Sequence, residues 1–208
     1  MERVHKLSAA FVFAFLCLHF ANHFAGLFGV AAHAQFMDAA RLIYRYPPVE
    51  WAVLIAFAIQ ILTGLPLIFE IWQKKKDFIH QLQAASGLVM TLFIVIHIAW
   101  VFLGREVLHL DTDFTYAAAG LASPVWKTIF YGFYGVGVFS LFLHFACIAY
   151  DIFKKTNKPV GYLCLIAVTS LGAYVTWLLL MMYGGHLYPV TIPDAYAHAF
   201  AKLSLGLR

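Results

Sequence analysis

Charged residues are scarce in this sequence. Asp, Glu, Lys and Arg together make up 12% of the 208 residues, while 63% of the residues are hydrophobic. Soluble domains average about 25% charged residues, so this composition excludes an ordinary soluble domain. The mean hydropathy of +0.81 agrees with that conclusion. We therefore expect an integral membrane protein. We expect no cleavable signal peptide, because the first apolar run is too long for one.

The sequence also lacks the motifs of several chemistries. It has three cysteines, Cys17, Cys147 and Cys164, and no two of them have the CxxC spacing of a metal or redox site. We expect all three to be small core residues rather than ligands. No glycine-rich nucleotide-binding motif is present either. The chain therefore has no motif of its own for a flavin nucleotide or an iron–sulfur cluster, and we expect no nucleic-acid partner.

Long apolar runs are what the sequence does contain. Five of them match the roughly 20 residues that a membrane-spanning helix needs, at about residues 7–30, 51–72, 84–104, 128–150 and 160–183. The expected fold is an all-α membrane protein, a bundle of five transmembrane helices that forms one domain over residues 1–208. Gly64 and Pro66 would allow a break in the second span of the kind that secondary transporters use, although membrane helices also tolerate proline.

Basic residues predict the orientation of these spans. In a five-span protein the basic residues at 3–6, 74–76 and 154–158 all fall on one side of the membrane, whereas the opposite loops mix arginine with aspartate and glutamate. Because cytoplasmic loops carry the excess of Lys and Arg, we expect the N-terminus in the cytoplasm and the C-terminus outside. The predicted location is the inner (cytoplasmic) membrane of a cell, as a multi-pass protein.

Two of the apolar runs resemble each other. LSAAFVFAFLCLHFANHFAG and ASGLVMTLFIVIHIAWVFLG each have a histidine eleven residues after a serine. Aligned on the serines, they share six identities in 19 positions, which are Ser8/Ser86, Phe15/Phe93, His19/His97, Ala21/Ala99, Phe24/Phe102 and Gly26/Gly104. Eleven residues are close to three helical turns, so each serine lies on the same stripe of the helix as its histidine. Ionisable residues at bilayer depth are rare and usually functional.

Two imidazoles at a similar depth suit haem. Haem iron accepts two axial nitrogens, and a helix bundle supplies an apolar slot. Zinc would want more ligands, usually with cysteine or carboxylate, and a proton relay would want Asp or Glu partners, which the first and third spans lack. We predict that His19 and His97 are the axial ligands of one haem b. Two separately satisfied structural histidines are the alternative. His23 shares the helix face of His19 and is the rival ligand.

Two further polar residues lie within the second and fourth spans. Gln60 is near the middle of the second span, and His144 lies toward the cytoplasmic side of the fourth. In a four-ligand bundle these positions would face each other and hold a second haem, but glutamine is a poor haem ligand. The sequence therefore favours one haem over two. We expect Gln60 and His144 to hydrogen-bond each other inside the membrane, or His144 to lie near a quinone.

The remaining ionisable residues are assigned to the ends of the spans. Arg105 is either the partner of a haem propionate or an interfacial anchor. Glu50 is either the acceptor of a quinol proton or a helix-start carboxylate favoured by the helix dipole. His186 is either interfacial or part of a polar pocket. We expect the other histidines to be solvated, namely His5, His33, His80, His109 and His198.

With these features, the chain resembles the cytochrome b membrane-anchor subunit of succinate dehydrogenases and fumarate reductases, in the branch built as a single five-helix polypeptide. The residues that carry the resemblance are ASGLVMTLFIVIH, the matching first helix, VEW before the second span and the Gln60 and His144 positions. In that branch, histidines from the first four helices bind two haems b, at positions that correspond to His19, Gln60, His97 and His144. The resemblance thus implies an outer haem on His19 and His97, and an inner site that departs from the family at Gln60.

The resemblance also implies a function. The chain would bind a quinone, dock flavoprotein and iron–sulfur subunits on the cytoplasmic face, and pass electrons between the iron–sulfur partner and the quinone. It would be a non-catalytic subunit of a tricarboxylic acid cycle enzyme or of a fumarate reductase, with the oligomeric state of the complex left open. The departure at Gln60 keeps a stand-alone haem b electron carrier as an alternative. A non-haem membrane scaffold or transporter is the third hypothesis.

Overall fold

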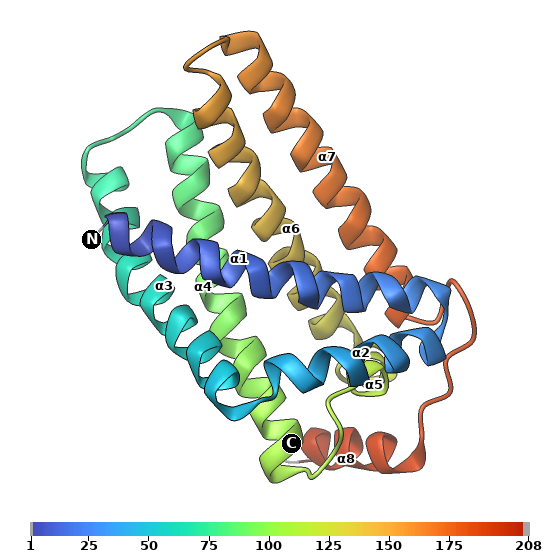
Figure 1. Cartoon of the computed structure of the whole chain (residues 1–208). Helices are drawn as coiled ribbons and strands as arrows, with labels where there is room; N and C mark the ends of the chain where they lie inside the picture. The colour runs from blue at the N-terminus through green and yellow to red at the C-terminus, as the bar shows by residue number, and fades with distance from the viewer. Residues whose placement is uncertain (1, 206–208) are drawn as a thin grey trace. The chain divides into compact units, whose positions relative to one another are not determined.

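The structure is a computed structural model that describes residues 2–205, and every regular element in that range is a helix (Figure 1). Five of these helical segments are long and apolar enough to cross a membrane, which confirms the five-span prediction. Their bounds are Arg3–Phe28, Pro47–Gln73, Phe78–Val107, Lys127–Phe153 and Lys158–Tyr183. The chain divides into two compact units, one that ends at Leu67 and one that begins at Ile68, and each is described by itself.

The first unit contains helix α1 (Glu2–Ala25), a short 3-10 helix (Gly26–Phe28), helix α2 (Val30–Tyr44) and most of helix α3 (Pro47–Gln73). The first span was predicted to run to residue 30, but Gly29 ends it. Gly29 has a φ of 117° and a ψ of 164°, a backbone conformation that glycine alone adopts without strain. The chain reverses there, and α2 lies beside α1 (Figure 1). A buried stripe on α2 faces this contact and consists of His33, Met37 and Ala40.

The second unit contains helices α4 (Phe78–Phe102), α5 (Phe114–Ala122), α6 (Lys127–Phe153), α7 (Lys158–Tyr183) and α8 (Asp194–Leu205). A single π-helical turn, Leu103–Val107, extends α4. Helices α4, α6 and α7 lie side by side in the order α4, α6, α7 (Figure 1). Three side chains cap helix starts by accepting hydrogen bonds from backbone N–H groups, namely Asp77 for α4, Asp113 for α5 and Asn157 for α7.

Glycines let these three helices pack closely. A Cβ built on Gly137 of α6 would come within 2.0 Å of the Phe93 ring of α4, and one built on Gly172 of α7 would come within 2.2 Å of Phe142 of α6. At both contacts a glycine thus leaves room for a phenylalanine side chain of the neighbouring helix. This use of small residues is the usual way in which membrane helices approach one another.

Several details differ from the sequence prediction. Helix α4 begins at Phe78 rather than at residue 84, because the Asp77 carboxylate caps it there. Helix α3 continues through Pro66, so the second span is not broken at that point. The short helices α2, α5 and α8 were not predicted. Cys147 is buried as expected, but the prediction was wrong for Cys17, which is exposed because it lies on an outward face of α1.

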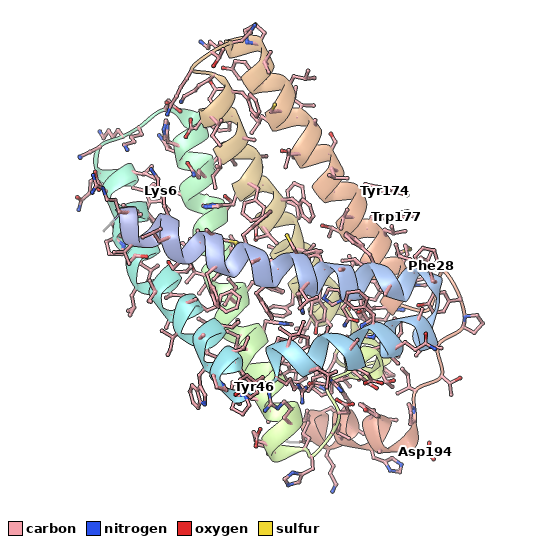
Figure 2. All side chains as sticks on the ribbon, in the orientation of Figure 1. Lys6, Phe28, Tyr46, Tyr174, Trp177 and Asp194 are labelled. Atoms are coloured by element: carbon pink, nitrogen blue, oxygen red, sulfur yellow. The ribbon has the colours of Figure 1, made fainter. Side chains whose placement is uncertain are left out.

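Large apolar side chains cover the outside of both units. Figure 2 shows Tyr174 and Trp177 projecting from α7, where they are 58% and 51% exposed and stack with their ring centroids 6.0 Å apart. Phe28, at the turn between α1 and α2, is 86% exposed. A soluble protein of this size seldom exposes so much contiguous apolar surface. Exposed apolar surface of this kind suits contact with the hydrocarbon of a membrane.

Candidate functional site

Two imidazoles on α1 contact each other. The Nε2 atoms of His19 and His23 are 3.0 Å apart, and their ring centroids are 4.5 Å apart. Their spacing of four residues places both on one helix face, as the sequence predicted. Phe15, one turn earlier, stacks on His19 with ring centroids 5.6 Å apart and planes 19° apart. In a hydrogen bond between two imidazoles, one nitrogen donates and the other accepts. The Nε2 atoms of the two rival ligands therefore point at each other.

Helix α2 adds a third imidazole, that of His33, which we expected to be solvated. His33 is 2% exposed, its ring centroid lies 6.4 Å from that of His23, and its Nε2 lies 3.1 Å from Nδ2 of Asn22. The prediction failed because α2 folds back along α1 after Gly29 and buries the stripe that begins at His33. The spacing of His33, Met37 and Ala40, which places all three on one helix face, was the available signal.

The His33 environment keeps its imidazole neutral. Burial, with a contribution from the Arg41 guanidinium, lowers the pKa of His33 to about 4. A neutral Nε2 can then accept the hydrogen bond that the Asn22 amide donates. This bond ties α2 to α1 one residue before His23, so the first unit holds a connected group of three imidazoles and one amide.

The second unit holds His97 in a similar manner. Phe93, one turn earlier on α4, stacks on the imidazole with ring centroids 5.4 Å apart and planes 16° apart. Two rings of α6 pack against this pair. The ring centroid of Phe133 lies 4.7 Å from that of Phe93, and the ring centroid of Tyr134 lies 6.4 Å from that of His97. The close approach of Phe93 depends on Gly137, which has no Cβ to displace the ring. Helix α6 thus braces His97 through Phe93.

The stacked Phe–His pair is therefore present twice. Phe15 with His19 and Phe93 with His97 are matching positions of the internal repeat, and their centroid distances differ by only 0.2 Å, from 5.6 to 5.4 Å. Each histidine also lies about one helical turn past the midpoint of its own span, on the bounds given above. The repeat that was read from the sequence thus extends to local side-chain geometry.

The polar residues of the second and fourth spans continue the repeat. In the first unit, Nε2 of Gln60 on α3 donates to the backbone carbonyl of His5, at 2.7 Å, and to the hydroxyl of Ser8. In the second unit, Nδ1 of His144 on α6 lies 3.1 Å from the backbone carbonyl of Gln83 and 3.4 Å from Oγ of Ser86. His5 and Gln83 each precede the repeated serine by three residues.

Each half of the chain thus contains a helix pair, α1 with α3 and α4 with α6, that is linked by the same two acceptors. Ser8 and Ser86 provide one acceptor of each link, and the carbonyl three residues earlier provides the other. The links satisfy the amide nitrogen of Gln60 and the Nδ1 of His144 within their own units. The bond that we expected between Gln60 and His144 is therefore not needed to satisfy these groups.

The contact with Gln83 also defines the proton position on His144. A backbone carbonyl can only accept, so Nδ1 of His144 carries a proton, and in the neutral imidazole Nε2 then presents its lone pair. Histidine ligands of metals almost always have this arrangement, with the second ring nitrogen donating to a carbonyl, a carboxylate or water. The amide nitrogen of Gln60 holds the equivalent place in the first unit, and it has no lone pair to offer.

The residues assigned to the span ends are placed as follows. Arg105 lies in the π-helical turn, with Nε 3.5 Å from the Glu106 carboxylate and its guanidinium carbon 5.7 Å from the Phe102 ring centroid. Glu50 is in the first turn of α3, where the helix dipole favours a carboxylate. Nε2 of His186 lies 3.1 Å from the Tyr131 hydroxyl.

Among the histidines that we expected to be solvated, His109 and His198 are exposed. The expectation was wrong for His5 as well as His33. His5 is half-buried, with Nδ1 2.9 Å from the Thr63 hydroxyl, because α3 packs against the start of α1. The His80 side chain is 24% exposed and lies between two carboxylates, 2.8 Å from Asp77 and 3.5 Å from Asp151.

No group of three or more His, Cys, Asp or Glu side chains in residues 2–205 is arranged to hold a metal ion. A haem differs from such a site, because the porphyrin supplies four ligands and the protein needs to supply only one or two. His19, His23, His97 and His144 are half-buried imidazoles within membrane spans and suit that donor requirement. Comparison of the chain with protein-family models, with curated protein sequences and with solved structures finds no match.

Proposed function

We propose that the chain is a haem b-containing membrane anchor subunit of a succinate:quinone or quinol:fumarate oxidoreductase. In this proposal it lies in the cytoplasmic membrane with its N-terminus inside, and it passes electrons between an iron–sulfur partner and a membrane quinone. One observation carries the proposal. The chain contains a helix pair twice, each pair linked through a serine and a preceding carbonyl, and each first helix carries a histidine stacked on a phenylalanine.

This duplicated arrangement suits a ligand that needs one imidazole from each half. We assign His19 and His97 as the axial ligands, with His23 as the alternative to His19. The Phe15 and Phe93 rings restrict the rotation of the two imidazoles, which lowers the conformational entropy that ligation would remove. When bound, the haem supplies one-electron transfer. The chain's own part is to hold the two rings in an apolar surrounding that excludes water.

The inner position, formed by Gln60 and His144, decides whether the chain would bind one haem or two. Nδ1 of His144 is bonded as the outer nitrogen of a haem ligand would be, with Nε2 as the coordinating atom. Gln60, in contrast, directs its amide nitrogen at α1 and is held there by His5 and Ser8. A residue held in this way does not replace a histidine as the opposite ligand. We therefore propose a single bis-histidine haem and no second one.

The partners follow from what the chain lacks. It carries no nucleotide-binding glycine motif and no cysteine cluster, so oxidation of succinate would take place in a flavoprotein, and an iron–sulfur protein would carry the electrons to this subunit. Both would dock on the cytoplasmic face of the membrane, where the positive-inside rule places the N-terminus. The subunit itself would be an electron-transfer and quinone-binding component rather than a catalyst.

Spectroscopy of the purified chain tests the haem assignment. We expect a reduced-minus-oxidised spectrum of a b-type cytochrome and one haem per chain. We expect His97→Ala to abolish the spectrum. Of His19→Ala and His23→Ala, the one that removes the second ligand should also abolish it, and we expect this to be His19→Ala. His109→Ala is the matched control, because this histidine is exposed and lies outside the proposed site, and it should leave the haem content unchanged. A wild-type chain without haem would refute the proposal and favour a non-haem scaffold or transporter.

A second candidate function is a stand-alone haem b electron carrier, which the fixed position of Gln60 favours. Without an inner haem, electrons from a soluble iron–sulfur partner would have a longer path to the outer haem. Purification of the tagged chain from its own membranes separates the two functions. Co-purification of a flavoprotein and an iron–sulfur protein supports the anchor. A chain that purifies alone, with haem that a quinol reduces, supports the carrier.

A further inference from the structure

Two lysine-rich turns lie at one end of the second unit. The turn between α3 and α4 carries Lys74, Lys75 and Lys76, and the turn between α6 and α7 carries Lys154, Lys155 and Lys158. Figure 1 shows that α4 begins and α6 ends at the same end of this unit. Nε2 of His80, in the first turn of α4, lies 3.5 Å from the carboxylate of Asp151, in the last turn of α6. The two lysine turns are therefore neighbours.

Most of the positive charge at this end has no counter-ion in the protein. Lys74 is paired with Glu70 at 2.7 Å, and Lys154 is paired with Asp151 at 2.6 Å. The Asp77 carboxylate is occupied by the N-terminus of α4 and by the imidazole of His80. In the range that the structure describes, the other four lysines are exposed and form no ion pair; they are Lys75, Lys76, Lys155 and Lys158. We call these four residues the lysine rim.

Exposed apolar side chains lie directly beside the lysine rim. Phe78 is 75% exposed, Ile152 is 58% exposed and Leu163 is 65% exposed, and each belongs to a membrane-spanning segment. Phe153 and Trp72 are also exposed, at 46% and 39%. The charges therefore lie just beyond the level at which these side chains would meet hydrocarbon. A ligand for this surface must offer both an anion and hydrocarbon chains.

We propose that this end of the second unit binds anionic phospholipids, with the lysine rim contacting the phosphate groups and the adjacent apolar side chains contacting the acyl chains. Anionic lipids attract basic segments next to membrane helices. A soluble acidic protein would supply the charge but not the hydrocarbon, so it matches only half of the surface. The proposal depends on the lysines and the membrane spans alone, and it does not require haem.

A lipid titration of the purified full-length chain tests this site. The chain in a neutral detergent is titrated with phosphatidylglycerol, and separately with phosphatidylcholine of the same acyl chains, while its thermal unfolding is followed by circular dichroism. We expect phosphatidylglycerol to raise the unfolding temperature more than phosphatidylcholine, and we expect salt to weaken the difference. Inorganic phosphate at the same concentration should have no effect, because it lacks the acyl chains.

Two sets of variants locate the site. Replacement of the four rim lysines by glutamine should lower the affinity for phosphatidylglycerol by about fivefold for each lysine removed, which is read as a higher lipid concentration at the midpoint of the titration. Replacement by arginine should preserve the affinity. Lys127→Gln with Lys202→Gln is the matched control, because Lys127 starts α6 at the opposite end and Trp126 bonds the carbonyl of Phe200 in α8 beside it. The glutamine variant should keep the helical spectrum of the wild type, since the rim is exposed.

Three outcomes would overturn the proposal. In the first, the two lipids raise the unfolding temperature equally. In the second, the control variant loses the response to phosphatidylglycerol as fully as the rim variant does. In the third, the rim variant keeps its lipid preference but loses a soluble protein that co-purifies with the wild type, which would assign the lysines to a protein partner. A failure of the haem experiment leaves the lipid result unaffected, so the two proposals fail separately.

Discussion

A methyl group at position 137 tests whether α6 positions His97 through Phe93. A Cβ on Gly137 would lie 2.0 Å from one carbon of the Phe93 ring and 2.4 Å from two others, whereas non-bonded carbons prefer about 3.5–4.0 Å. Phe93 is enclosed on other sides by Phe133, at 4.7 Å, and by His97, at 5.4 Å between ring centroids. The ring must therefore shift by roughly 1.5 Å to relieve the contact, and the support of His97 shifts with it.

The expected cost is the difference between two effects. Overpacking of a filled helix contact costs about 1–3 kcal/mol. Alanine is favoured over glycine in a helix by about 1 kcal/mol. The difference between these two effects is about 0–2 kcal/mol. Because the added Cβ would lie only 2.0 Å from the ring, Gly137→Ala should lower the free energy of unfolding by about 2 kcal/mol, the upper end of that range. Gly132→Ala, five residues earlier on the same helix, has nothing within 4 Å of its added methyl, and should be neutral or stabilising by up to about 1 kcal/mol.

The assay is thermal or denaturant unfolding of the purified chain in detergent, followed by circular dichroism, with the haem content measured on the same samples. We expect Gly137→Ala to lose both stability and haem, although every proposed ligand is intact. In a Phe93→Ala background, the same methyl group should cost nothing, because the ring that it displaces is gone. Equal stability of the two alanine variants, or simple additivity in the double variant, would refute the reasoning.

Three further perturbations have defined outcomes. The pKa of His33 is about 4 in the fold and about 6.5 in the unfolded chain, so the unfolded state binds more protons between these two pH values. We therefore expect the free energy of unfolding to be highest above pH 6.5 and to fall toward pH 4. His33→Gln should flatten this dependence when unfolding is measured against pH. Asp77→Ala removes the cap of α4 and should lower the free energy of unfolding by about 1 kcal/mol, with Asp77→Asn as the variant that retains it; equal losses in both would argue against capping. Gly172→Ala should lower the free energy of unfolding by about 2 kcal/mol, the upper end of the same difference, because its Cβ would lie 2.2 Å from Phe142. A wild-type unfolding curve would contradict the packing of α6 on α7.

The five spans could be predicted because the membrane imposes a simple rule. A helix that crosses hydrocarbon needs about 20 apolar residues and satisfies its own backbone hydrogen bonds, so composition along the chain is enough to find it. The internal repeat was also visible, since Ser8 with His19 and Ser86 with His97 keep a fixed spacing. The stacking of Phe15 and Phe93 on these histidines follows locally from the four-residue spacing on a helix.

The short helices and the surroundings of the histidines could not be predicted in this way. Helix α2 has no span-like composition, and its burial of His33 depends on the reversal of the chain at Gly29. Cys17 is apolar enough to be buried in a soluble core, but a membrane protein also has an apolar outside, so hydrophobicity alone does not assign it to the interior. Cys17 is exposed and His33 is buried, each against the prediction, because burial depends on which helix packs against that face.

The amino-acid sequence by itself determined that the chain is helical, that five helices are long enough to cross a membrane, and that two of them repeat a serine and a histidine. These properties depend only on composition and on distances along one helix. The tertiary structure alone decided that Gln60 bonds Ser8 and that His144 bonds Gln83, because the acceptors are more than 50 residues away along the chain. Contacts of that kind depend on how helices pack, and no spacing within a single helix encodes them.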